Sequence, residues 1–241
     1  MLTLEQWGEA GPVYGPAPGE RGLPGVVLVH GAEGPGAGWS HRFAAILAAH
    51  GFLALPVAFG EGDIFGAGPI AGVDLSAIPA AGRALAAHPR ASGRVGLFGW
   101  SKGGEAALLV AALASAPFAC VAAHAPPATV TGAVDPAAIR AGAALSRAPD
   151  APRAWVWAGH DAGLAPGTPI AVERAGVPLF LSSGTADAVV PHAEALALAA
   201  RAPRAELFVA EGQGHGLDFD AEPLLWARLT AFLRRHLAEG A

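Results

Sequence analysis

One serine of this chain stands where it could act as a nucleophile. Ser101 lies within the run Gly-Trp-Ser-Lys-Gly-Gly at 99–104, between an apolar stretch at 94–98 and a second one at 105–115. This pattern predicts a strand, a tight turn and a helix, in which flanking glycines let the chain pass without a Cβ clash. The free N–H groups at the start of the helix would stabilise negative charge on a reacting carbonyl. The chemistry that we expect is acyl transfer through Ser101.

A serine nucleophile needs a base, and the base needs an acid that orients it. Asp187 ends a loop of small residues that follows a buried apolar run, and His215 lies between glycines after the next apolar run. Both side chains therefore follow predicted strands, and the carboxyl ends of parallel strands form the ligand-binding edge of an open sheet. The order Ser101, Asp187, His215 predicts a catalytic triad.

Other acids and histidines are weaker candidates for these roles. Asp161 and Glu173 precede the apolar run 177–181, whereas the acid of such a triad usually comes after that strand. His192 follows Asp187 too closely in the chain to fit the usual order of the triad.

The turn His-Gly-Ala-Glu-Gly at 30–34 follows an earlier apolar run and is the second place where chemistry is expected. We predict that the backbone N–H of Ala32 forms an oxyanion hole with the backbone N–H of Lys102. His30 is expected to brace the turn rather than to react. Glu33 would either tune the charge of the site and bind polar substrate atoms, or be an ordinary exposed loop acid.

The elements that must position these residues alternate between strand and helix. The predicted strands are 26–30, 52–57, 94–98, 118–123, 153–157, 177–181 and 206–210, and the predicted helices are 39–50, 73–88, 101–115, 191–201 and 222–237. Unbroken apolar strands between helices indicate an α/β fold with a mostly parallel sheet covered on both faces. A length of 241 residues fits a single domain over 1–241, with an irregular lead-in at 1–24.

Two segments rich in glycine and proline interrupt this alternation. The first, 58–72, carries Phe65, and the second, 126–152, leads on to Trp155. Long connections often form lids or pocket walls, so we expect these aromatic side chains, together with Trp100 beside the nucleophile, to line a substrate pocket. The alternative, that they only pack over the sheet, is at least as well supported by the sequence.

The strand predicted at 118–123 contributes two further candidates. His124 ends it at the catalytic edge and could contact the substrate, whereas Cys120, in its middle, is expected to be buried and inert. No cluster of His, Cys, Asp and Glu has the spacing of a metal site, so we predict no metal and no other cofactor.

Composition limits the partners of the chain. The formal net charge of -5 argues against nucleic acid, which favours a basic face, and a single cysteine gives no sign of an oxidising compartment. The first ten residues lack the pattern of a signal peptide, and Ser115 and Pro117 split the one long uncharged stretch, so no membrane insertion is expected. We therefore expect a cytoplasmic monomer or homodimer that acts on a small molecule.

The run Leu-Phe-Gly-Trp-Ser-Lys-Gly-Gly-Glu at 97–105 resembles the nucleophile turn of the C-terminal catalytic domains of acyl-CoA thioesterases and bile acid-CoA:amino acid N-acyltransferases. From about residue 24 onward the chain is also similar to dienelactone-hydrolase-like proteins. This resemblance implies the α/β-hydrolase fold, with Ser101 as nucleophile, Asp187 as acid and His215 as base. Dienelactone hydrolases use a cysteine where this chain has Ser101, which argues against a dienelactone substrate. The acyltransferases tend to use a cysteine as well, which favours simple hydrolysis.

The sequence therefore predicts a serine hydrolase that cleaves a carboxylic ester or thioester through an acyl-enzyme on Ser101. Two alternatives stay open: a catalytically silent member of this fold that binds a ligand, and a peptidase or acyltransferase. The complete set of Ser101, Asp187 and His215 argues against the silent protein. Neither the acyl chain nor the leaving group follows from the residues.

Overall fold

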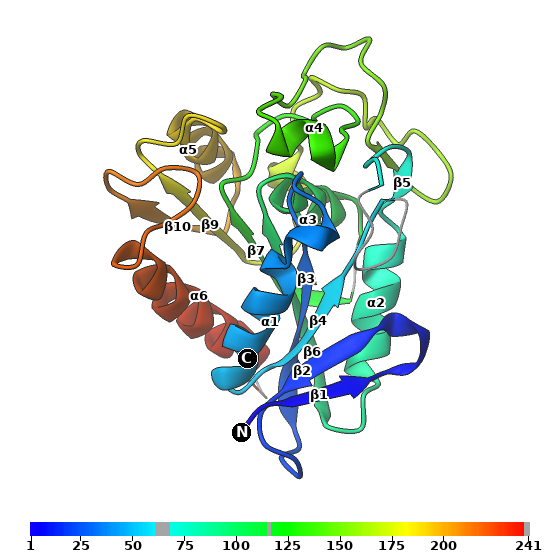
Figure 1. Ribbon diagram of the computed structural model, residues 1–241, viewed down its shortest axis with the longest axis vertical. Helices are drawn as coiled ribbons and strands as arrows, with labels where there is room; N and C mark the ends of the chain where they lie inside the picture. The colour runs from blue at the N-terminus through cyan, green and yellow to red at the C-terminus, as the bar shows by residue number, and fades with distance from the viewer. Residues whose placement is uncertain (61–67, 115–116, 239–241) are drawn as a thin grey trace.

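The computed structural model describes residues 1–60, 68–114 and 117–238, and its centre is an eight-stranded sheet (Figure 1). In spatial order the strands are β1 (Thr3–Gln6), β2 (Pro12–Gly15), β4 (Leu53–Val57), β3 (Leu23–Val29), β6 (Ala91–Trp100), β7 (Phe118–His124), β9 (Leu179–Gly184) and β10 (Ala205–Ala210). The last six strands in this order are mutually parallel, and β1 and β2 join one edge in antiparallel pairing.

Helices cover both faces of this sheet, which confirms the predicted fold class. One face packs against α1 (Trp39–Ala49) and α6 (Ala221–Leu237), and the other against α2 (Ala77–Ala86), α3 (Lys102–Leu113) and α5 (His192–Arg201). Successive residues of a strand point to opposite faces. The whole of β3 is consequently apolar, because alternate side chains enter the two cores.

The long connection between β7 and β9 lies beyond the carboxyl ends of the strands, at the top of Figure 1. It contains the short helix α4 (Pro136–Arg140), the 3-10 turn η3 (Val172–Arg174) and β8 (Trp155–Val156). The strand β8 pairs in parallel with β5 (Val73–Asp74) in a separate two-stranded sheet. This connection therefore forms the roof over the edge where the candidate site lies.

The lead-in expected to be irregular at 1–24 is instead partly a hairpin, which corrects that prediction. The strand β1 pairs with β2, and β2 pairs with β4, so these residues extend the sheet. The signal in the sequence was weak because the strands are only four residues long and the second begins at Pro12 and ends at Gly15. Buried Arg90 donates to the carbonyl of Pro16 at 2.8 Å and so fastens the end of the hairpin.

Two predicted elements around the second sheet were also wrong in extent. The helix predicted at 73–88 begins only at Ala77, because the Asp74 carboxylate accepts hydrogen bonds from the N–H groups of Ser76 and Ala158, both at 2.9 Å. The strand predicted at 153–157 is reduced to β8 and lies outside the main sheet, since β7 pairs directly with β9.

Neither a membrane-crossing helix nor a metal cluster is found in the described part of the chain. No helix there is both long enough and apolar enough to span a membrane. No group of three or more His, Cys, Asp or Glu side chains is placed to hold a metal ion. Cys120 is buried in β7, and burial raises the pKa of its thiol to about 12, so the thiol stays protonated near neutral pH.

Candidate active site

Ser101 occupies a sharp turn between β6 and α3. Its backbone has φ 55° and ψ -118°, a conformation that L residues adopt only under strain. Two glycines make this turn possible: a Cβ on Gly99 would collide with the backbone of Gly103, and a Cβ on Gly103 would collide with the carbonyl of His30. The N–H of Ser101 donates to the carbonyl of His124 at 2.8 Å, which holds the turn against the neighbouring strand.

Asp187 and His215 follow β9 and β10, and the structure brings them together. The Nδ1 atom of His215 lies 2.8 Å from Oδ2 of Asp187, whose side chain is fully buried. The other carboxylate oxygen accepts N–H groups from Val189 at 2.8 Å and Val190 at 2.9 Å. Burial alone would raise the pKa of Asp187, but these hydrogen bonds outweigh it and lower the pKa. The ionised acid therefore assigns the proton of His215 to Nδ1 and leaves Nε2 as an acceptor.

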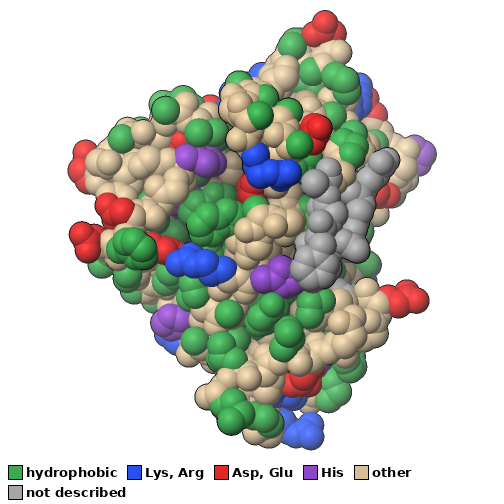
Figure 2. All heavy atoms as spheres, viewed as in Figure 1, with side chains coloured by type: hydrophobic (Ala, Val, Ile, Leu, Met, Phe, Trp, Pro, Cys, Tyr) green, Lys and Arg blue, Asp and Glu red, His purple; other side chains and the backbone are tan. Residues whose placement is uncertain are grey.

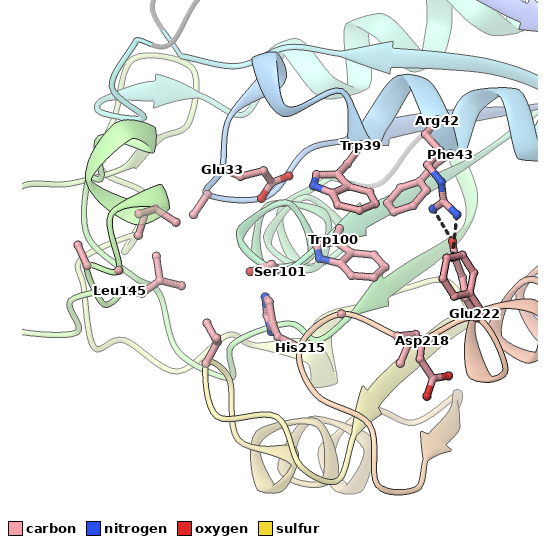
Figure 3. A pocket seen from close by; sticks show the side chains of 18 residues that line it. Glu33, Trp39, Arg42, Phe43, Trp100, Ser101, Leu145, His215, Asp218 and Glu222 are labelled. Atoms are coloured by element: carbon pink, nitrogen blue, oxygen red, sulfur yellow. Dashed lines mark hydrogen bonds and ion pairs between the residues drawn. The ribbon is translucent and has the colours of Figure 1, made fainter.

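Ser101 and His215 line the same pocket, and the imidazole of His215 points toward Ser101 (Figure 3). The serine is 4% exposed and the histidine side chain 22% exposed, so the pair is reached only from within the pocket. Asp187 lies on the side of the imidazole away from the pocket. The arrangement combines a hydroxyl, an imidazole whose Nε2 has no partner among the described residues, and a buried carboxylate, which are the groups that acyl transfer requires.

The two amides predicted for an oxyanion hole belong to Ala32, which lines the pocket together with Ser101, and to Lys102, which follows Ser101 in the chain. Ala32 is buried and lines the pocket, and Lys102 is the first residue of α3, where the N–H has no partner within the helix. Among the described residues, neither N–H donates to a protein acceptor. By contrast, the N–H of Gly31 is occupied, because it donates to the Glu33 side chain at 3.0 Å.

The side chains of Lys102 and Glu105 do not face the pocket but form a buried polar cluster beneath the roof. Lys102 Nζ lies 3.7 Å from Glu105 Oε2 and donates to the carbonyl of Gly132 at 3.0 Å. Glu105 accepts the N–H of Thr131 at 2.8 Å and the indole N–H of Trp155 at 2.6 Å. Sequence reasoning missed this role, although the Lys-Gly-Gly-Glu spacing places the two charges one helical turn apart.

The predicted substrate residues divide into those that reach the pocket and those that do not. Trp100 and Glu33 line it. Trp155 does not: it is fully buried and donates to Glu105, so its predicted substrate contact is wrong. Phe65 lies outside the described residues.

His124 was predicted to touch the substrate and instead lies fully buried behind the pocket. Its ring stacks on Trp100 with centroids 4.0 Å apart. Its Nδ1 lies 2.9 Å from the hydroxyl of Ser182, and its Nε2 lies 3.3 Å from the carbonyl oxygen of His215. Burial lowers the pKa of His124 to about 4, so the ring is neutral at pH 7. Because a carbonyl can only accept, Nε2 carries the proton and Nδ1 accepts from Ser182.

The remaining acids and histidines are engaged elsewhere. Asp161 pairs with Arg153, and Glu173 pairs with Arg201, both away from the pocket. His192 lies 2.7 Å from the hydroxyl of Ser183. His30 braces the turn as expected, since its Nε2 lies 3.0 Å from both the N–H and the carbonyl oxygen of Phe59.

The pocket has a volume of about 780 Å³ and opens on the face shown in Figure 2, where hydrophobic side chains gather over α1 and α6. Ser101 lies between two lobes (Figure 3). One lobe carries aromatic side chains and ends at an ion pair, and the other is aliphatic and comes from the roof. The lining contains residues that sequence reasoning missed: Trp39, Arg42, Phe43, Ile139, Ala143, Leu145, Val189, Leu217, Asp218, Phe219 and Glu222.

Solved structures resemble this chain along its whole length. A proposed dienelactone hydrolase from Klebsiella pneumoniae subsp. pneumoniae has a TM-score of 0.67 at 19% identity, covering 98% of each chain. The esterase domain of a Rhodothermus marinus protein has a TM-score of 0.60 at 20% identity, covering 99% of each chain. A puromycin-hydrolyzing peptidase from Mycobacterium tuberculosis has a TM-score of 0.66 at 20% identity, covering 98% of this chain and 39% of that one. These likenesses show the α/β-hydrolase fold.

The family is shown by sequence rather than by these structures. The chain has no significant match among curated proteins. The model of the prolyl oligopeptidase family matches residues 71–240, which include Ser101, Asp187 and His215. This match spans well over half of the chain and identifies it as a hydrolase of the α/β-hydrolase superfamily. The chain belongs to the prolyl oligopeptidase family.

Proposed function

We propose that the protein is a serine hydrolase that cleaves a carboxylic ester or thioester through an acyl-enzyme on Ser101. The observation that carries the proposal is the 2.8 Å contact between His215 Nδ1 and buried Asp187, with His215 turned toward Ser101 in one pocket. A hydroxyl at that position is activated only when a neutral imidazole can take its proton.

The reaction begins when Ser101 Oγ attacks the substrate carbonyl while His215 Nε2 takes its proton. The N–H groups of Ala32 and Lys102 hold the oxyanion, and the loss of one such donor costs about 3 kcal/mol of transition-state stabilisation. His215 then gives the proton to the leaving alcohol or thiol as the carbonyl reforms. A water molecule, deprotonated by the same imidazole, attacks the acyl-enzyme and releases the acid.

Peptide hydrolysis is the second candidate, because the matching family is named for an oligopeptidase and a peptidase is among the similar structures. The pocket supports the ester first. The aliphatic lobe and the aromatic lobe surround Ser101 with mainly apolar side chains, which suit the apolar parts of an ester.

Initial rates on three substrate sets test the proposal: 4-nitrophenyl esters of increasing chain length, acyl-CoA thioesters, and dipeptide 4-nitroanilides. Ser101→Ala serves as the control for serine-dependent turnover. Ester or thioester turnover that vanishes in Ser101→Ala is the expected result. Turnover of the anilides alone would replace the esterase with a peptidase, and equal rates in Ser101→Ala would remove Ser101 from the mechanism.

A further inference from the structure

The pocket beside Ser101 carries an excess of negative charge. Its described lining contains three carboxylates, Glu33, Asp218 and Glu222, and a single cation, Arg42. The residues outside the description contain no Lys or Arg in the sequence. Most serine hydrolase substrates are uncharged at the scissile bond, so the charge of the lining bears on the groups attached to it.

The one cation of the lining is already neutralised. Arg42 Nη2 lies 2.7 Å from Glu222 Oε2, and both guanidinium nitrogens of its fork face that carboxylate. Glu222 also accepts the indole N–H of Trp226 at 3.0 Å. The hydrogen bonds from Arg42 lower the pKa of Glu222, which favours the ion pair, and the two charges balance each other. To bind Arg42, an anionic substrate would have to displace the carboxylate of Glu222, which accepts two hydrogen bonds from the guanidinium.

Among the described residues, the side chains of the other two carboxylates of the lining form no ion pair, although the Arg140 guanidinium donates to the backbone carbonyl of Glu33 at 2.8 Å. Asp218 accepts the N–H groups of Asp220 and Ala221 at 3.0 and 2.9 Å and the amide of Gln213 at 2.8 Å, which keep its pKa low. Glu33 accepts one hydrogen bond, from the N–H of Gly31, on Oε1. Within the described residues, its Oε2 accepts none.

Glu33 is the unpaired acid nearest to the reacting bond. It follows Ala32, which is one of the two proposed oxyanion donors, and its carboxylate faces Ser101 across the pocket (Figure 3). Burial raises the pKa of Glu33, and hydrogen bonds from backbone N–H groups, followed by the charge of a protonated His215, counteract that rise. In a pocket whose walls are mainly apolar, a like charge brought near this acid is poorly screened.

Resting on the function proposed above, we infer that this pocket selects uncharged or cationic esters and rejects anionic substrates, coenzyme A thioesters included, and that Glu33 determines the selection. The aromatic side chains of Trp39, Phe43 and Trp100 then hold the apolar part of the substrate. Glu33 Oε2 is left to accept a hydrogen bond from a hydroxyl, amide or ammonium group of the substrate.

A matched pair of substrates tests the inference: 4-nitrophenyl butyrate and 3-carboxy-4-nitrophenyl butyrate, which differ by one carboxylate. At pH 8 the kcat/KM of the neutral ester is divided by the kcat/KM of the anionic ester. This ratio is then divided by the corresponding ratio of the rates at which hydroxide alone hydrolyses the two esters. We expect the normalised ratio to exceed about tenfold in the native protein. Glu33→Gln should reduce it about fivefold, which corresponds to ~1 kcal/mol of repulsion.

Glu20→Gln is the matched control, because it removes the same charge from an exposed residue that does not line the pocket. It should leave the ratio unchanged. A native ratio near one, or a ratio that Glu33→Gln does not alter, would overturn the inference while ester turnover keeps the proposed function intact. If neither ester is cleaved and a fluorophosphonate does not label Ser101, the proposed function fails and the inference falls with it.

Discussion

The ring of His124 lies directly behind the loop of His215, with its Nε2 atom 3.3 Å from the carbonyl oxygen of that residue. The same ring stacks on Trp100, which immediately precedes Ser101. One neutral, buried imidazole therefore touches both the strand that ends at the nucleophile and the loop that carries the proposed base. We regard His124 as a positioning residue, since it does not line the pocket.

Replacing His124 should slow the chemical step without weakening substrate binding. In His124→Leu we expect kcat to fall about tenfold, as the loss of ~1.4 kcal/mol of positioning would produce, with KM little changed. His124→Gln, which keeps an N–H donor, should recover part of the loss. The comparison of kcat and KM for the two variants is the measurement. Equal rates for Gln and Leu would contradict a role that depends on the hydrogen bond.

Replacing Asp187 should be far more damaging to turnover than to folding. Asp187→Asn keeps the shape of the side chain but favours the wrong tautomer of His215, and a drop of about 10⁴ in kcat is the usual size of that effect. Thermal unfolding checks that the variant folds, and ester turnover gives the rate. Glu173→Gln is the matched control, because it changes an exposed acid that does not line the pocket. A comparable loss of turnover in this variant would show that the loss is not specific to Asp187.

Buried His30 and His124 should make the protein less stable as the pH falls. Burial lowers the pKa of each to about 4, whereas an unfolded chain returns it to about 6.5. Between these two pKa values the unfolded state therefore binds more protons than the folded state. The contribution of the two rings to the free energy of unfolding is fully present above pH 6.5 and is lost as the pH falls toward 4. The linkage amounts to about 3 kcal/mol for each ring.

Urea unfolding at a series of pH values measures this effect. His124→Gln should have a shallower fall in the free energy of unfolding between pH 6.5 and 4 than the native protein. Exposed His50 provides the control, and His50→Gln should keep the native slope. A native slope that survives in His124→Gln would show that His124 does not titrate as its burial requires.

The effects of removing Lys102 and Glu105 on the free energy of unfolding should not be additive, because these two buried charges form one pair. Lys102→Met leaves Glu105 without its cation, and breaking one partner of a buried pair costs about 3–5 kcal/mol. The double variant with Glu105→Gln should lose less stability than the sum of the single variants. Chemical unfolding of the three proteins closes the cycle, and strict additivity would argue against direct coupling.

The parallel core and the three candidate catalytic residues could be predicted from the sequence because a local pattern of residues indicates each of them. Ser101 stands between apolar runs with glycines that the turn requires, and Asp187 and His215 follow strands whose apolar runs reflect burial on both faces. The hairpin of β1 and β2 was missed because pairing along a sheet edge leaves only short, mixed sequences.

The pocket lining was largely inaccessible from sequence because it depends on how distant elements meet. Arg42 comes from α1 and Glu222 from α6, and the sequence of neither helix predicts that these two side chains form an ion pair. The prediction for Trp155 failed for a related reason. Its indole N–H satisfies a buried carboxylate on α3, a requirement that appears only once the roof is folded onto that helix.

The assignment of Ser101 as the nucleophile is tested by the mass of the protein after treatment with a fluorophosphonate, with the adduct located by peptide mapping. We expect one adduct, on Ser101, that is absent in Ser101→Ala and forms much more slowly in Asp187→Asn. No adduct on the native protein, or an adduct that persists in Ser101→Ala, would contradict the assignment of Ser101 as the nucleophile.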